Sequence, residues 1–166
     1  MNYGEDRDDF RYLATAVMFV REFSGGPRLL EVGGGVQRGC KYLERLPDFE
    51  RTVIESDEDQ GIRLPGVRWF SGQFENWPVD GRYDVVLCLQ VLEHVPDPAA
   101  FISKLFSCAP VVVLSVPYLW PAGKCRDHVH DPIDEEKLAA WVGRVPDHSS
   151  IVRDRNCKRL VVAYIQ

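Results

Sequence analysis

The sequence predicts an α/β protein with a mostly parallel, seven-stranded, doubly wound sheet, helices on both faces and a C-terminal antiparallel hairpin. Three observations support this fold class. Short apolar runs alternate with helical patterns, one apolar run ends at a cluster of four glycines, and the last two runs are separated only by a short polar turn. Strands joined through helices pair in parallel, whereas strands joined by a tight turn pair antiparallel.

Length and composition favour one domain in a reducing compartment. The 166 residues suffice for a single domain, expected over residues 1–166 with an N-terminal helix and cap at 1–26. The net charge of -5 argues against a surface built to bind nucleic acid. Five scattered cysteines without a C-x-x-C pair favour the cytoplasm. No apolar run approaches the ~20 residues that cross a bilayer, so no membrane contact is expected.

The N-terminal part is expected to form a helix, a strand and a second helix. Apolar residues spaced three and four apart predict an amphipathic helix over residues 8–23, capped by Asp8 or Asp9. A strand at 28–32 then leads into the glycine cluster of Gly33, Gly34, Gly35 and Gly39. The apolar spacing after this cluster predicts a helix as far as Leu46.

Two further strands are expected before the middle of the chain. The β-branched run at 51–55 ends in an acid, Glu55, and the next apolar run is 67–70. The short stretch between them contains a proline and a glycine, so the second crossover helix must be vestigial. Residues 71–78 are expected to form a loop.

The second half continues the alternation of strands and helices. The most continuous apolar run, 83–89, predicts a central parallel strand. Asp97 is expected to cap a helix that Pro98 opens, and a buried strand follows at 109–116. After an irregular segment at 118–132, a helix and the two strands of the hairpin are expected at 134–141, 149–154 and 159–165.

Ligands of such sheets bind beyond the carboxyl ends of the strands. Glu31, Glu55, Gln73 and residues 89–94 all fall at these ends, so we expect them to converge on one crevice. An acid about twenty residues after a glycine-rich turn, at the end of the next strand, is where nucleotide-binding folds hold ribose hydroxyls. Glu55 occupies this position.

Several segments together resemble one known family. Residues 31–35 resemble an acid-x-Gly-x-Gly signature, Glu55 a ribose-binding acid, and residues 72–75 an adenine-side loop. Residues 83–98 give the most specific match, to an "F-D-V-V…V-L-E-H-V-x-D-P" segment. These are motifs of the class I, Rossmann-like S-adenosylmethionine-dependent methyltransferases, particularly those that act on small molecules. The resemblance covers roughly residues 25–166.

The resemblance implies S-adenosylmethionine as the cofactor. The implied binding residues are Glu31, Gly33, Gly34 and Gly35 for the methionine end, Glu55 for the ribose, Gln73 and Phe74 for the adenine side, and Leu89 and Gln90 for the lining of the site. Two positions depart from the family pattern. Gln37 replaces the usual third glycine, and Gln73 stands where an aspartate is common. The side-chain carbonyl of Gln73 can accept the same hydrogen bond that the aspartate would.

Three histidines are candidates for a general base. His94 follows the central strand, and His128 and His130 lie in the irregular segment, which the resemblance places over the crevice. An imidazole accepts protons near neutral pH. The alternative for the two loop histidines is structural, with a hydrogen bond to Asp127 or Asp131.

Glu93 and His94 also raise a metal-assisted alternative. In the small-RNA 2′-O-methyltransferases, to which this segment is similar, a Glu-x-x-Glu-His segment and a later histidine supply metal ligands. Here Gln90 replaces the first acid, which leaves Glu93 and His94 with His128 or His130. A neutral amide in place of a carboxylate weakens a hard-cation site, so no metal site is assigned.

The sequence thus predicts methyl transfer from S-adenosylmethionine to an unidentified acceptor, most simply a small molecule. Alignment of the two reactants carries much of such a reaction, so no catalytic residue is strictly required. The acceptor site is expected between the N-terminal helix and residues 118–132. Because no long insertion covers it, a homo-oligomer or another partner could complete it. A non-catalytic nucleoside-binding or scaffold protein is the alternative from another class.

Overall fold

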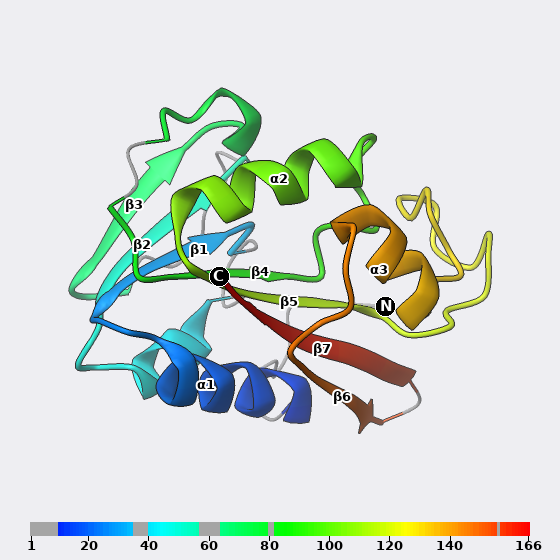
Figure 1. Ribbon diagram of the computed structural model, residues 1–166, viewed down its shortest axis with the longest axis horizontal. Coiled ribbons are helices and arrows are strands. Elements are labelled where there is room, and N and C mark those ends of the chain that lie inside the picture. Colours follow the sequence, from blue (N-terminus) through cyan, green and yellow to red (C-terminus); the bar gives the residue numbers. More distant parts are fainter. Residues whose placement is uncertain (1–9, 35–39, 57–63, 80–81, 156) are drawn as a thin grey trace.

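One seven-stranded sheet organises the structure, a computed structural model that describes residues 10–34, 40–56, 64–79, 82–155 and 157–166 (Figure 1). The strand order is β3-β2-β1-β4-β5-β7-β6. All pairs are parallel except those of β7 with β5 and β6. The strands are β1 (Arg28–Val32), β2 (Glu50–Glu55), β3 (Val67–Ser71), β4 (Val85–Leu89), β5 (Val111–Pro117), β6 (His148–Asp154) and β7 (Cys157–Ile165). The predicted mostly parallel sheet with a terminal antiparallel hairpin is confirmed.

Helices cover both faces of this sheet. α1 (Arg11–Phe23) packs on one face, against β5, β6 and β7, and α2 (Pro98–Cys108) packs on the other, against β4 and β5. α3 (Glu135–Val142) lies against α2 on the same side of the sheet (Figure 1). Two short 3-10 turns, η2 (Lys41–Arg45) and η3 (Phe74–Asn76), complete the described elements.

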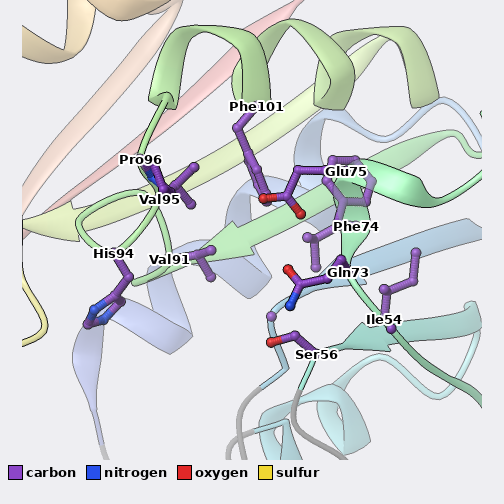
Figure 2. A pocket seen from close by; sticks show the side chains of 13 residues that line it. Ile54, Ser56, Gln73, Phe74, Glu75, Val91, His94, Val95, Pro96 and Phe101 are labelled. Carbon is purple, nitrogen blue, oxygen red and sulfur yellow. The ribbon is translucent and has the colours of Figure 1, made fainter.

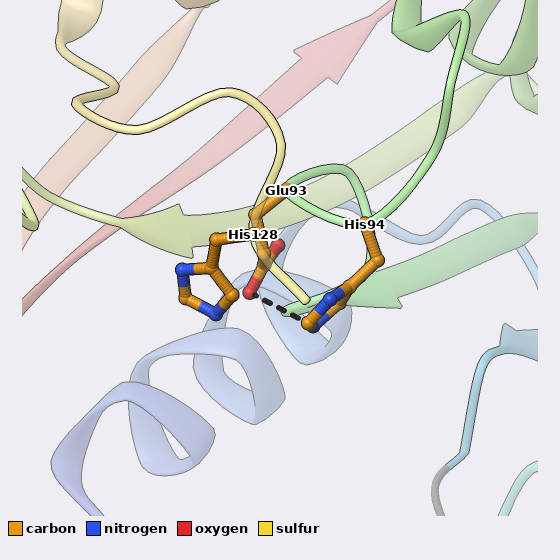
Figure 3. A group of neighbouring side chains, drawn as sticks. All are labelled: Glu93, His94 and His128. Atoms are coloured by element: carbon orange, nitrogen blue, oxygen red, sulfur yellow. Dashed lines mark ion pairs between the residues drawn. The ribbon is translucent and has the colours of Figure 1, made fainter. Parts of the chain in front are cut away.

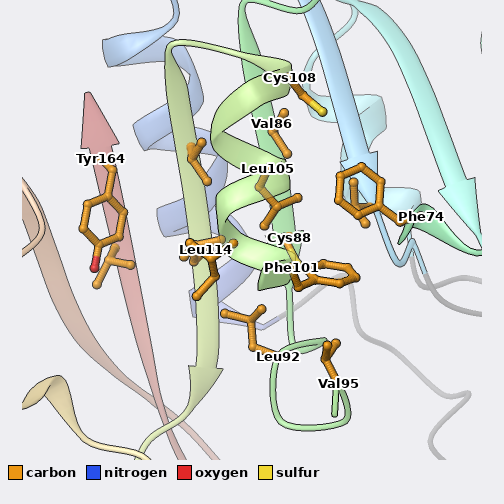
Figure 4. Packing of buried hydrophobic residues seen from close by; sticks show 14 of the residues in the cluster. Phe74, Val86, Cys88, Leu92, Val95, Phe101, Leu105, Cys108, Leu114 and Tyr164 are labelled. Carbon is orange, nitrogen blue, oxygen red and sulfur yellow. The ribbon is translucent and has the colours of Figure 1, made fainter. Parts of the chain in front are cut away.

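Each face has its own apolar core because the side chains of a strand alternate between faces. In β4, Val85, Leu87 and Leu89 belong to the core under α1, whereas Val86 and Cys88 belong to the core under α2. Figure 4 shows the second core, to which α2 contributes Phe101, Leu105 and Cys108. Burial on both faces explains why β4 reads as a continuous apolar run.

The helix expected to end at Leu46 is instead the single 3-10 turn η2. An α-helical bond to the carbonyl of Leu43 would need an N–H at position 47, which is proline. The Leu43 carbonyl accepts from the backbone N–H of Leu46 at 3.0 Å and from Nη1 of Arg51 at 3.0 Å. The turn is therefore closed by i to i+3 bonds and by a tertiary contact.

The cap of α1 also differs from the prediction. Asp8 and Asp9 lie outside the described residues, and the N-cap is Phe10, which makes no side-chain cap. The carboxylate of Asp154, at the end of β6, accepts from the N–H of Arg11 at 2.6 Å and from that of Tyr12 at 3.1 Å. A distant acid thus satisfies the first amides of the helix, which local sequence could not indicate.

Several predictions concern residues outside the described part. Gly35, Gln37 and Gly39 of the glycine turn are among them, as is the vestigial helix expected between β2 and β3, where residues 57–63 fall. Among the described residues, no helix has the length and apolar character needed to cross a bilayer.

Candidate functional site

A cavity opens at the carboxyl ends of β1 and β2, beside the turn that follows β4 (Figure 2). The chain leaves β1 toward β2 and β3 on one side and returns to β4 on the other, so this is the switch point at which open α/β sheets bind ligands. The cavity has a volume of about 200 Å³ and is open to solvent, so it is smaller than the roughly 300 to 1,000 Å³ of most pockets for small molecules and cofactors.

The turn after β1 needs glycine at two positions. Gly33 has a φ of 77°, in the left-handed region, and its N–H donates to the carbonyl of Ile54 at 2.9 Å. A Cβ at Gly33 would lie 2.4 Å from Cγ2 of Val91, and one at Gly34 would lie 2.7 Å from Cγ1 of Val53. The backbone of Gly33 and Gly34 therefore packs closely against its neighbours, and the absence of side chains lets main-chain amides approach a ligand.

Glu31 lies beneath this turn, outside the wall of the cavity. Its side chain is 1% exposed, and the Tyr42 hydroxyl donates a 2.5 Å hydrogen bond to Oε2. The net pKa of Glu31 is raised to about 8. Burial raises it most, the Tyr42 hydrogen bond lowers it, and the charge of Glu55 raises it. Burial and the Glu31 charge also raise the pKa of the Tyr42 phenol well above its usual value. Glu31 is consequently mostly protonated at pH 7.

Glu55 ends β2 at the border of the cavity. Its side chain is buried, and the hydroxyl of Ser56, which lines the cavity, donates to Oε1 at 3.3 Å. The backbone carbonyl of Glu55 accepts from the N–H of Gly72 at 2.9 Å, which ties the segment after β3 to the end of β2. The carboxylate is thus one residue removed from the cavity wall.

Gln73 and Phe74 both line the cavity (Figure 2). The Phe74 ring is buried, with its centroid 5.0 Å from that of Phe101, and Nζ of Lys104 lies 5.2 Å from the Phe74 centroid. Phe74 therefore belongs to the core and to the cavity wall at once. Gln73 is exposed, so its amide is accessible to a ligand.

Leu89 is the last residue of β4 and Gln90 follows it, and neither lines the cavity. Leu89 is buried in the core under α1. Gln90 has a φ of 59°, and its Nε2 donates to Oγ of Ser115 at 3.0 Å while its N–H donates to the Ser115 carbonyl at 2.9 Å. This strained conformation redirects the chain into the turn that carries Val91 and His94 into the cavity wall.

Glu93, His94 and His128 form a compact cluster beside the cavity (Figure 3). One ligand atom of each residue lies within 4.8 Å of those of the other two. Nε2 of His94 lies 3.9 Å from Oε1 of the buried Glu93, and the two imidazole centroids are 4.9 Å apart. A carboxylate and two imidazoles can hold a transition metal or move a proton.

Hydrogen bonds determine which ring nitrogens are available. Nδ1 of His94 lies 2.8 Å from the carbonyl oxygen of Asp127, which can only accept, so Nδ1 carries the hydrogen and Nε2 keeps its lone pair. Nδ1 of His128 lies 2.6 Å from Oδ2 of Asp131, whose side chain is 1% exposed. An ionised Asp131 can only accept, so Nδ1 of His128 then carries the hydrogen and Nε2 keeps its lone pair.

His130 lies outside this cluster. Its Nε2 is 2.6 Å from the carbonyl oxygen of Val95, and its ring packs edge-on against Trp141 with the centroids 5.1 Å apart. The Lys137 ammonium also donates to the His130 carbonyl at 2.5 Å. These contacts join the irregular segment to the turn after β4 and to α3, which is a structural role.

The structure brings some of the sequence-predicted residues onto one wall and leaves others behind it. Those that line the cavity are Gly33, Gln73, Phe74 and His94. Gly34, Glu55, Leu89, Gln90, His128 and His130 are not among the lining residues, nor is Glu31. Sequence reasoning missed Ser56, and only its place directly after Glu55 could have indicated it.

A sequence relative covers a small part of the chain. A ubiquinone biosynthesis O-methyltransferase of Psychrobacter cryohalolentis is 53% identical over 38 residues, which are 21% of this chain and 15% of that enzyme. The match thus spans less than a fifth of the relative's length.

Solved structures and a family model match nearly the whole chain. A magnesium protoporphyrin IX methyltransferase from Synechocystis PCC 6803, with bound S-adenosylhomocysteine, has a TM-score of 0.72 and 16% identity over 93% of this chain and 81% of its own. The Burkholderia thailandensis 1,6-didemethyltoxoflavin-N1-methyltransferase has a TM-score of 0.71 and 17% identity over 96% and 80%. The family model described as "Methyltransferase domain" matches residues 3–164. The chain belongs to this family of methyltransferase domains.

Proposed function

We propose that this chain transfers the methyl group of S-adenosylmethionine to a small-molecule acceptor. The observation that carries the proposal is the cavity at the switch point of a methyltransferase domain, with glycine backbone on one wall and Gln73 and Phe74 on another. Two structural neighbours of known activity bind S-adenosylhomocysteine, which supports the choice of cofactor.

The proposed binding roles combine the geometry of the cavity with the motif positions of the sequence. Glu55 is suited to accept from the ribose hydroxyls, because a carboxylate offers two acceptor oxygens to a vicinal diol. Gln73 and Phe74 are assigned to the adenine, as an accessible amide and an aromatic wall. The backbone of Gly33 and the residues around it are assigned to the methionine end, with Glu31 supporting them from below, since its Cγ would lie 3.6 Å from a Cβ at Gly34.

The chemistry demands alignment more than acid–base catalysis. When bound, S-adenosylmethionine supplies an activated methyl group on its sulfonium. Orientation of two reactants supplies roughly 7 to 11 kcal/mol of a barrier, and a general base adds about 10² to 10⁴-fold. We assign the base to His128, whose Nδ1 is engaged by Asp131 and whose Nε2 faces the cluster with His94. It would take the proton that the acceptor loses.

A screen of methyl incorporation tests the proposal. Purified protein is incubated with tritiated S-adenosylmethionine and fractionated metabolite pools, and one labelled product is expected. The His128→Ala variant should lose about 10² to 10⁴-fold of this transfer, while His130→Ala keeps most of it. Absence of label in every pool, together with no adenosine absorbance in the purified protein, would instead identify a scaffold that has lost catalysis.

The proposed setting is a reducing one, namely the cytoplasm. All five cysteines are free, and Cys40, Cys88 and Cys108 are buried. We further propose that a second subunit or another partner completes the acceptor site. Light scattering in the presence of S-adenosylhomocysteine measures the molar mass that decides this.

A second candidate function, metal-assisted methyl transfer, is favoured by the spacing of Glu93, His94 and His128. Two imidazole nitrogens and one carboxylate oxygen suit zinc, iron or manganese, and the Nδ1 bonds would orient both rings from behind. A metal there would polarise the acceptor oxygen as a Lewis acid. A small-RNA acceptor would also fit such chemistry.

Metal analysis separates the two candidates. Protein purified without chelators should retain one transition metal per chain under the second candidate, and His94→Ala and His128→Ala should lose it while His130→Ala retains it. Retention of no metal, with transfer unaffected by a chelator, leaves His128 as a general base.

A further inference from the structure

A basic and aromatic cluster lies beside His128. The ring of Trp120 is 6.4 Å from that of His128, and Nζ of Lys124 is 5.2 Å from the Trp120 ring. The guanidinium carbon of Arg159 is 6.0 Å from the Trp120 ring and 5.8 Å from the Tyr12 ring. We name Tyr12, Trp120, Lys124 and Arg159 the Trp120 cluster.

The Trp120 cluster lies at the same edge of the sheet as the cavity. Arg159 pairs with Pro117, the last residue of β5, so it lies at the carboxyl end of a parallel strand. Neighbouring rings connect it to the cavity, since Trp120 is next to His128 and His128 is 4.9 Å from His94, which lines the cavity. The segment of residues 118–132 supplies Trp120 and Lys124, and α1 supplies Tyr12.

The guanidinium of Arg159 has donors that the described residues do not use. Of its five N–H groups, one donates to the Lys158 carbonyl, at 3.4 Å. Nε is shielded from solvent and has no acceptor among the described residues. Asp154, in the same hairpin, accepts from the first amides of α1, and Asp131, in the segment that carries Trp120, faces His128.

The surroundings add positive charge. The hairpin residues 153–159 contain four basic side chains and one acid, Asp154, in a chain whose net charge is -5. Lys124 brings a further ammonium group to the ring of Trp120. A local basic site on an acidic protein attracts anionic ligands selectively.

We propose that the Trp120 cluster binds an anionic group, a carboxylate or a phosphate monoester, on the methyl acceptor. The fork of Arg159 matches the two oxygens of such a group, and the rings of Trp120 and Tyr12 flank its apolar part. The nucleophile of the acceptor then lies toward His128. This assignment rests on the proposed function and names the class of substrate.

Binding of small probe anions tests it. Protein labelled at its indole nitrogens is titrated with benzoate, benzamide and phenyl phosphate, with and without S-adenosylhomocysteine, and the Trp120 signal is assigned from Trp120→Phe. Benzoate or phenyl phosphate should bind at least about tenfold more tightly than the neutral benzamide and shift the Trp120 signal. The tighter anion identifies carboxylate or phosphate as the group.

Three variants locate the effect. Arg159→Gln should abolish the preference for the anion, and Arg159→Lys, which keeps the charge but lacks the fork, should retain part of it. Arg153→Gln removes the same charge from an exposed position of the hairpin and should keep most of the preference.

Three results would overturn the inference, of which the first two are equal binding of the anions and benzamide to wild type and a preference that survives in Arg159→Gln. Binding of an oligouridylate through Arg159 without binding of either small anion would also overturn it. Failure of the proposed function is separate, since wild type would then bind no S-adenosylhomocysteine while the titrations without it still report on Arg159.

Discussion

Glu31 is a buried acid, and its burial makes the free energy of unfolding depend on pH. Its pKa rises to about 8, chiefly through burial, from an ordinary value near 4.5. Between about pH 4.5 and 8, the folded protein therefore keeps a proton on Glu31 that the unfolded chain has released. Its stabilising contribution is complete below pH 4.5 and is lost as the pH rises through 8.

Glu31→Gln tests this residue. Glutamine resembles the protonated acid and keeps an acceptor for Tyr42, so the variant should gain free energy of unfolding relative to wild type as the pH rises from 5 to 8.5. One pKa unit corresponds to about 1.4 kcal/mol, which urea titrations at several pH values resolve. Glu44→Gln, an exposed acid of η2, is the control. A difference that stays constant across this pH range would refute the assignment.

Nδ1 of His128 lies 2.6 Å from Oδ2 of Asp131, and we expect this carboxylate to position the ring if His128 is the proposed base. Asp131→Asn should lower kcat for methyl transfer by about tenfold or more, because an amide no longer stabilises the charged imidazole that forms when His128 takes a proton. KM for S-adenosylmethionine should stay unchanged. Asp127→Asn, in the same segment with an exposed side chain, should leave kcat as in wild type. An equal effect of both substitutions would argue against a positioning role.

At the scale of elements, α1 depends on an acid from the hairpin. Asp154→Ala leaves the N–H groups of Arg11 and Tyr12 without their acceptor and should lower the free energy of unfolding by about 1–2 kcal/mol. Asp97→Ala, which removes one exposed bond to Ala100 at the start of α2, should cost less. Urea denaturation measures both, and the reverse order would mean that Asp154 is not the effective cap.

The glycines on either side of β1 provide a matched pair of substitutions, Gly33→Ala in the turn after the strand and Gly25→Ala before it. Gly33 combines a φ of 77° with a Cβ position 2.4 Å from Val91, whereas a Cβ at Gly25 would meet no atom within 4 Å. We expect a loss of about 1–3 kcal/mol in stability for Gly33→Ala and none for Gly25→Ala. Gly33→Ala with Val91→Ala should recover part of it. No loss in Gly33→Ala would contradict the close approach described above.

For the whole molecule, hydrophobic patterning was sufficient to predict the strands of the sheet and the helices α1, α2 and α3, but not the 3-10 geometry of η2. β4 was evident because burial on both faces makes its sequence uniformly apolar. The single turn of η2 and the cap of α1 could not be predicted, since they depend on Arg51 and Asp154, which meet these elements only after folding. Local patterns carry no information about such contacts.

The residues of the candidate site that come shortly after the carboxyl ends of strands could be predicted from the sequence. Gln73 and His94 line the cavity because they come directly after strands or their turns. The contact of His94 with His128 depends on how the irregular segment folds back over the sheet, and sequence patterns do not determine that path. The burial of Glu31 with Tyr42 likewise appears only once η2 is placed.

Glu55 is the residue through which we propose that the cavity binds S-adenosylmethionine. Calorimetric titration with S-adenosylhomocysteine tests it most directly, in wild type, in Glu55→Ala and in Glu50→Ala, which removes an exposed acid at the opposite end of β2. We predict one site per chain, an affinity at least about tenfold weaker in Glu55→Ala, and an unchanged affinity in Glu50→Ala. No binding to wild type, or equal affinity in wild type and Glu55→Ala, would contradict the account.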